Sequence, residues 1–166
     1  MDNIIGNEQA KRACEIAIKG KLKILFIGKG EAEDFVLYLA KEGIEAKALQ
    51  PCKCGYLGDE RIVCTCKPEQ IAKQRYIISN ISRHWADMVV ETHSPHTDKV
   101  KKWLEENYKI LDNESISLLE MGYKNLNLTT GELNKIINVA ITIASLDSSK
   151  VLVQHIAEAL QYRSRK

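Results

Sequence analysis

The sequence of 166 residues has few glycines and prolines, 9 and 3 respectively, and only 6% of its residues are aromatic. This scarcity excludes collagen-like and low-complexity chains, and 45% hydrophobic with 28% charged residues is the composition of an ordinary globular domain. A chain of this length forms one domain, or one domain with a small appendage, and can bury a hydrophobic core.

The sequence also lacks a long hydrophobic run, an export signal and an excess of one charge. No stretch approaches the roughly 18 consecutive apolar residues of a membrane-spanning helix, and the first residues are not a charged start before an apolar segment. We therefore expect a cytoplasmic protein. With 24 Lys and Arg against 22 Asp and Glu, the net charge of +2 neither indicates nor excludes nucleic acid as a partner.

Periodicity in the first half predicts a small α/β unit. Residues 8–19 repeat alanines on one helical face, with Asn7 as the expected N-cap. An apolar run at 22–27 predicts a strand, and a helix at 31–41 and a strand at 45–49 follow. Strand, glycine turn, helix and strand in this order are near the minimum for a parallel βαβ unit.

The second half is predicted to be mainly helical. Pro68 suits the first position of a helix that runs to about Ser82, and residues 86–91 predict a strand. The strongest signal is a capping box formed by Thr129 and Glu132 ahead of two apolar stripes. The helices expected after the strand contain the stripe Val100, Trp103 and Leu104, residues 113–122, residues 133–144 and residues 153–160.

Four of the five cysteines cluster in one segment, while Cys14 lies in a helical pattern and is expected to be a buried apolar residue. The four are two C-x-C pairs separated by nine residues: Cys52, Cys54, Cys64 and Cys66. Four thiolates can close a tetrahedron around a structural zinc ion if the segment turns back as a hairpin at Gly58-Asp59. Four reduced thiols are the alternative, and a disulfide is the least favoured state without an export signal.

Three blocks of sequence, in this order, resemble the magnesium-chelatase and ComM-type AAA+ ATPases. They are IGNEQAKRA at 5–13, the cysteine segment PCKCGYLGD with CTC and PEQI, and HIAEALQYR at 155–163. The resemblance implies an α/β fold in which residues 1–92 form a truncated AAA+ core, including a Cys-rich segment at 51–68. Residues 93–166 would form an all-α lid of about four helices.

The same resemblance implies that the chain is a degenerate member. A Walker A loop, G-x-x-x-x-G-K-[ST], holds phosphate with backbone amides, a lysine and a hydroxyl. Here Gly28-Lys29-Gly30 lacks the terminal Lys and Ser or Thr, and the acids Glu31, Glu33 and Asp34 place negative charge where an anion would bind. A structural turn is also favoured over a dinucleotide fingerprint, because Glu33 replaces its third glycine.

Other parts of the family's ATPase machinery are also missing from this sequence. Between Gly30 and Pro51 there is room for one helix and one strand, so the strand that carries the Walker B acids is absent and no magnesium site is expected. Trp85 stands where the family has an arginine, and Gly131 where the lid has another. We therefore expect no ATP hydrolysis. A weak adenine contact at Ile4, Ile5 and Gly6 is the most that the resemblance implies.

The resemblance implies two functional classes. The first is a non-catalytic pseudo-ATPase module that joins a related ATPase ring, such as that of a full-length ComM-like paralogue, or forms a homo-oligomer. Such a module could also associate weakly with DNA through residues of the cysteine hairpin, namely Lys53, Tyr56 and Arg61. The second is an ATP-binding subunit of a DNA-processing ATPase whose active site a neighbour completes. The first is favoured, because a neighbour can supply an arginine but cannot rebuild a phosphate loop.

Two loop histidines, His93 and His96, match no helical ligand pair and are expected to be solvated.

Overall fold

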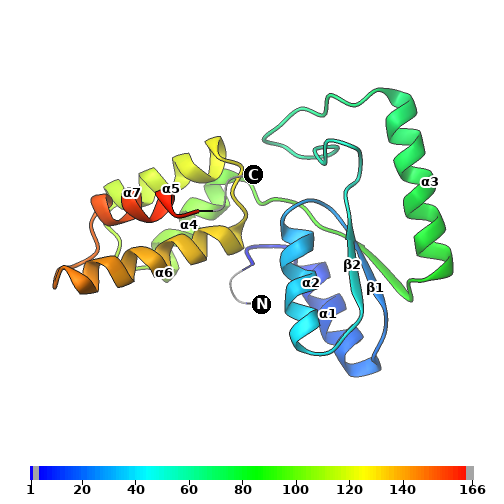
Figure 1. Ribbon diagram of the computed structural model, residues 1–166, viewed down its shortest axis with the longest axis horizontal. Helices are drawn as coiled ribbons and strands as arrows, with labels where there is room; N and C mark the ends of the chain where they lie inside the picture. The colour runs from blue at the N-terminus through cyan, green and yellow to red at the C-terminus, as the bar shows by residue number, and fades with distance from the viewer. Residues whose placement is uncertain (2–3, 164–166) are drawn as a thin grey trace. The chain divides into compact units, whose positions relative to one another are not determined.

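A computed structural model describes residue 1 and residues 4–163 of the chain. The last three residues of the predicted lid, 164–166, lie outside this range. The chain divides into two compact units, Met1–Ser94 and Pro95–Lys166 (Figure 1). The described residues form seven helices and one three-stranded sheet, so the predicted mixed α/β class is confirmed. No helix within the described ranges is both long and apolar enough to span a membrane.

The first unit is built around a parallel sheet of strand order β2-β1-β3. The central strand follows a helix, and each edge strand follows a helical crossover, as a parallel sheet requires. The elements are α1 (Glu8–Gly20), β1 (Ile24–Ile27), α2 (Glu31–Lys41), β2 (Ala46–Leu49), α3 (Pro68–His84) and β3 (Met88–Glu91). Each lies within two residues of the predicted bounds.

One face of this sheet carries the core of the first unit. Ile24 and Phe26 of β1 are fully buried beneath α1 and α2, and the ring of Phe26 stacks on Phe35 of α2 with 5.2 Å between centroids. Cys14 of α1 is fully buried, as predicted, and this burial raises the pKa of its thiol to about 12. A thiol with this pKa is protonated and packs as a small apolar group.

The third helix, α3, lies on the opposite side of the strands from α1 and α2 (Figure 1). Pro68 occupies its first turn, as predicted, and the Gln70 side chain accepts a hydrogen bond from the Lys67 backbone N–H at 3.0 Å. None of its 17 residues is fully buried. This helix therefore covers its face of the sheet much less tightly than α1 and α2 cover theirs.

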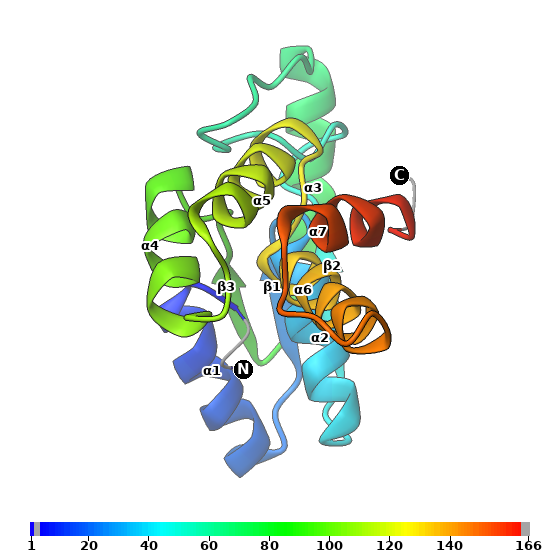
Figure 2. The ribbon, with the colours of Figure 1, turned by 90° about the vertical axis from the view of Figure 1, so that its left-hand side faces the viewer.

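The second unit consists of four helices, in which α4 packs on α5 and α6 on α7 (Figure 2). The predicted capping box is confirmed: Thr129 Oγ1 accepts from the Glu132 N–H at 3.1 Å, and Glu132 Oε2 accepts from the Thr129 N–H at 2.7 Å. His155 is buried and accepts the Leu152 N–H at 2.9 Å, a cap that the sequence did not reveal. The four helices are α4 (Thr97–Asn107), α5 (Asn113–Asn125), α6 (Thr130–Leu146) and α7 (Val153–Gln161).

Asn7 lies at the predicted N-cap position of α1, but its side chain makes different hydrogen bonds from the expected cap. Asn7 stands at the N-cap position with φ 57°, and its side chain makes no capping hydrogen bond. Its amide donates instead to the His93 carbonyl, and its oxygen accepts from the His93 N–H, both at 2.9 Å. These two hydrogen bonds join the start of α1 to the segment that leaves β3, so the side chain has a tertiary role rather than a local one.

Candidate metal centre beside a closed glycine turn

The four clustered cysteines meet in space. Their Sγ atoms all lie within 4.8 Å of one another, with separations of 3.4 Å for Cys52–Cys54, 3.6 Å for Cys52–Cys64 and 3.7 Å for Cys54–Cys64. All are free thiols; Cys52 is buried and the other three are half-buried. Thiolates gathered this closely are a ligand set that can hold one metal ion.

The intervening segment turns back on itself by two tight turns. The Gly55 N–H donates to the Cys52 carbonyl and the Asp59 N–H to the Tyr56 carbonyl, both at 3.1 Å. Gly55 and Gly58 have φ values of +84° and +86°, which favour glycine. The predicted reversal near Gly58 is therefore present, although this stretch of the described chain forms turns and not paired strands.

The thiols differ in acidity because their surroundings differ. A hydrogen bond from the Tyr56 backbone N–H is the main cause that lowers the pKa of Cys54 to about 6. The pKa of Cys64 is raised to about 12: the Cys66 N–H lowers it, but lost solvation and the Cys52 and Cys54 thiols raise it more. Cys54 is therefore the thiol that ionises first in the metal-free cluster.

The glycine turn between β1 and α2 lies beside this cluster, and Gly28 is required there by a close approach. A Cβ at Gly28 would come within 2.0 Å of Thr92 Oγ1 and 2.8 Å of the Thr92 carbonyl oxygen. A side chain would therefore push the end of β1 away from the end of β3. Sequence reasoning gave Gly28 a turn role, and the structure shows which contact imposes it.

Lys29 fastens the cysteine segment onto this turn. Its Nζ donates to the Cys54 carbonyl oxygen at 3.0 Å and lies 3.7 Å from the centroid of the Tyr56 ring. Gly55 packs so closely that a Cβ there would come 2.5 Å from Lys29 Cδ. The cavity left between turn and segment is about 20 Å³, which admits about one water molecule and is too small for a phosphate group.

A buried carboxyl group completes the closed turn. Glu31 is 1% exposed, and its Oε2 accepts a hydrogen bond from Ser94 Oγ at 2.9 Å. Its Oε1 is buried without a hydrogen-bond partner in the described chain. Loss of solvation raises the pKa of Glu31, while the nearby Arg61 charge acts in the opposite direction. Of the three acids predicted to face the turn, only Glu31 is buried, and Glu33 is exposed.

The residues predicted for nucleic-acid contact do not form one open surface. Arg61 is 9% exposed at its side chain and pairs with Asp59 at 3.4 Å, also through its backbone N–H at 2.7 Å. Tyr56 is half-buried and faces Lys29, so of the three residues only Lys53 is exposed. The ring of Tyr56 and the charge of Arg61 are used within the unit itself.

The remaining candidate residues are distributed through the chain. Ile4 and Ile5 are buried, Ile4 in the core with α1, and Gly6 has φ +67°. Contact of these residues with adenine stays a prediction. His93 and His96 are exposed, as expected for solvated loop residues.

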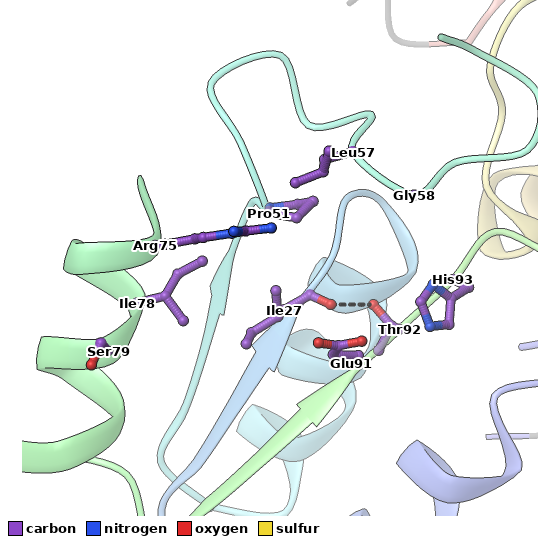
Figure 3. Close-up of a pocket in the computed structure, with 10 residues that line it drawn as sticks. All are labelled: Ile27, Pro51, Leu57, Gly58, Arg75, Ile78, Ser79, Glu91, Thr92 and His93. Carbon is purple, nitrogen blue, oxygen red and sulfur yellow. Dashed lines mark hydrogen bonds between the residues drawn. The ribbon is translucent and has the colours of Figure 1, made fainter. Parts of the chain in front are cut away.

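A groove separates α3 from the carboxyl ends of β1 and β3 (Figure 3). The groove has a volume of about 490 Å³. It lies between β1 and β3, at the topological switch point of the sheet, where parallel α/β sheets usually bind their ligands. The sequence did not reveal it, because its walls come from four separate segments. They include Ile27, Leu57, Arg75, Ile78, Glu91 and His93.

Comparison with known proteins identifies the class to which these elements belong. The sequence model of the family described as magnesium chelatase, subunit ChlI C-terminal, matches residues 69–163, more than half of the chain. The chain belongs to this magnesium-chelatase-related family, which confirms the predicted resemblance. No curated protein matches the chain. The matched span covers α3, β3 and the four-helix unit, so the cysteine cluster and the glycine turn lie outside it.

The acidity of Cys54 gives a testable prediction for the metal-free protein. At pH 7 Cys54 should react with iodoacetamide before Cys64, because a thiol with a pKa of about 6 is mostly thiolate and one with a pKa of about 12 is not. Peptide mass spectrometry after brief labelling measures the order, with buried Cys14 as the unreactive control. Labelling of Cys64 ahead of Cys54 would show that the thiols are arranged differently.

Proposed function

We propose that this chain is a non-catalytic, AAA+-like binding module that assembles with an active ATPase of its own family. The observation that carries the proposal is the closed glycine turn. In phosphoryl transfer, a loop and its lysine hold the phosphates and a metal ion neutralises the developing charge. Here no lysine stands at the Walker A position, the lysine inside the turn, Lys29, is engaged by Cys54 and Tyr56, and the cavity of about 20 Å³ cannot hold a phosphate.

The electrostatics of the turn support the same proposal. A helix N-terminus favours an anion, and at the start of α2 this position is occupied by the buried carboxyl group of Glu31. A phosphate at this point would have to displace the Glu31 carboxyl group, and an ionised Glu31 would repel it strongly in a site of low dielectric. The alternative function, an ATP-binding subunit completed by a neighbour, would require the cysteine segment to leave the turn and Glu31 to become solvated.

We further propose that the four cysteines hold a structural zinc ion. Four sulfurs at the usual Zn–S distance of about 2.3 Å form a tetrahedron with edges of about 3.8 Å. The separations of 3.4 to 3.7 Å among the sulfurs of Cys52, Cys54 and Cys64 are close to this value. Four thiolates leave no open coordination position, so the ion would order the segment and take no part in chemistry.

The zinc proposal predicts one equivalent of zinc per chain after purification without chelator. The double variant Cys54→Ser/Cys64→Ser should lose the ion and unfold at a lower temperature, because metal binding contributes to folding. The matched control is Cys14→Ala, which removes a thiol outside the cluster and should keep the full equivalent. Less than about a tenth of an equivalent of zinc in the unsubstituted protein, with all four thiols titrating freely, would contradict the zinc proposal.

One experiment on the assembled protein separates the two functions. The chain is mixed with a purified active ATPase of the family from the same organism, and size-exclusion chromatography measures complex formation. A binding module should co-elute, show no ATP turnover alone, and leave the turnover of the complex unchanged when Lys29 is replaced by alanine. Turnover lost on Lys29→Ala would support the ATP-binding alternative, and failure to co-elute would contradict assembly with that ATPase.

A further inference from the structure

The helix α3 carries cations that lack acidic partners. From its N-cap Lys67 to its end, the segment contains one acid, Glu69, and four Lys and Arg. No carboxylate in the described residues lies within ion-pair distance of Lys73, Arg75 or Arg83. All three are exposed. The helix therefore holds a positive field that its own unit does not neutralise.

Some cations elsewhere in the same unit have acidic partners, whereas no carboxylate in the described residues lies within ion-pair distance of the exposed Lys19, Lys21 and Lys41. On α1, Arg12 pairs with Glu15 at 2.6 Å, and Lys23 before β1 pairs with Glu45 at 3.6 Å. An ordinary solvated helix face mixes the two signs in this way. Arg83, in the last turn of α3, also stabilises the helix dipole, but Lys73 and Arg75 lie in the helix interior where the dipole gives little stabilisation.

An exposed aromatic ring lies among these charges. Tyr76 is 70% exposed and follows Lys73 by three residues, and Asn80 and Arg83 continue the same face at helical spacing. The stripe from Lys73 to Arg83 is about 15 Å long at 1.5 Å per residue. An outward tyrosine between cations is the arrangement in which a ring stacks on a base while the charges contact phosphates.

We propose that the stripe Lys73, Tyr76, Asn80 and Arg83 binds single-stranded nucleic acid, with Arg75 on the adjoining flank of α3, where it lines the groove of Figure 3. The cations contact backbone phosphates, the ring of Tyr76 stacks on one unpaired base, and Asn80 hydrogen-bonds a phosphate or base edge. The faces of bases inside a duplex are covered by their neighbours, so the exposed ring specifies a single strand. This site does not depend on the proposed assembly with an ATPase, because it needs neither nucleotide nor partner.

A protein with an acidic surface is the competing occupant, and the composition of the stripe favours nucleic acid. Protein interfaces are enriched in tyrosine and arginine but depleted in lysine, and they centre on buried apolar anchors. The outward neighbours of Tyr76 one turn away are Ala72, Lys73, Ser79 and Asn80, which are small or polar. Ile77, 38% exposed, is the one large aliphatic side chain bordering the described stripe, so the stripe offers mainly charge and one stacking surface.

Fluorescence anisotropy with a labelled twenty-nucleotide oligothymidylate at low salt tests the site on the full chain. The triple variant Lys73→Gln/Arg75→Gln/Arg83→Gln should bind at least tenfold more weakly. Its plot of log affinity against log salt should be shallower by about 2, because each single-strand phosphate contact contributes about 0.7. Tyr76→Ala should weaken binding roughly tenfold by removing the stacking surface while leaving the salt slope unchanged.

The matched control is Lys19→Gln/Lys21→Gln/Lys41→Gln, which removes the same charge from exposed positions outside α3 and should bind like the unsubstituted protein. Circular dichroism verifies that each variant is folded. If the two triple variants lost the same amount of binding affinity, the loss would be an effect of net charge alone, and the proposed site would be wrong. Binding of a duplex as tight as that of the single strand, equal competition by polyglutamate, or no binding below about millimolar would each overturn the proposal as well.

Discussion

The arrangement of the glycine turn and the cysteine segment in the first unit depends on the contacts of the Lys29 ammonium group. It reaches from the glycine turn into the cysteine segment, where it donates a hydrogen bond to the carbonyl oxygen of Cys54 and faces the ring of Tyr56. In a working phosphate loop this kind of charge is directed at the ligand. Here it is directed at the chain itself, and the loop is closed by the segment that it holds.

The Lys29 contacts and the proposed zinc ion differ in how much free energy they contribute to ordering the cysteine segment. A cation–π contact contributes about 0.5 to 2 kcal/mol and a charge-assisted hydrogen bond about 1.5 to 3 kcal/mol. A structural zinc site in a small peptide contributes about 10 to 16 kcal/mol. The proposed ion would therefore supply most of the free energy that orders the segment, while Lys29 determines where the ordered segment lies.

Local patterns predicted those parts of the fold that depend on local interactions. The capping box at Thr129, the bounds of α2 and the clustering of the four cysteines were all visible in the sequence. The cause is that caps, helical periodicity and C-x-C spacing act over a few residues. The family resemblance rested on three blocks of sequence, at residues 5–13, in the cysteine segment and at residues 155–163, and not on caps or periodicity.

Features that depend on distant segments were not predictable from the sequence. Asn7 lies at the N-cap of α1, but its side chain bonds to His93, 86 positions away, instead of to the first turn of the helix. Arg61 is a cation on a polar loop, yet it is buried with Asp59 near the carboxyl group of Glu31. The unpartnered charge of α3 likewise emerges only when the positions of all surrounding acids are known.

The central claim, that an ordered cysteine segment closes the glycine turn, is tested most directly by hydrogen–deuterium exchange with and without metal. Stripping the metal with a chelator should increase exchange in residues 52–66 and, with it, in the turn at 28–31. Exchange in the four-helix unit should stay unchanged and provides the internal reference. Deprotection of the cysteine segment with no change at residues 28–31 would contradict the account, because it would show that the turn is closed without the segment.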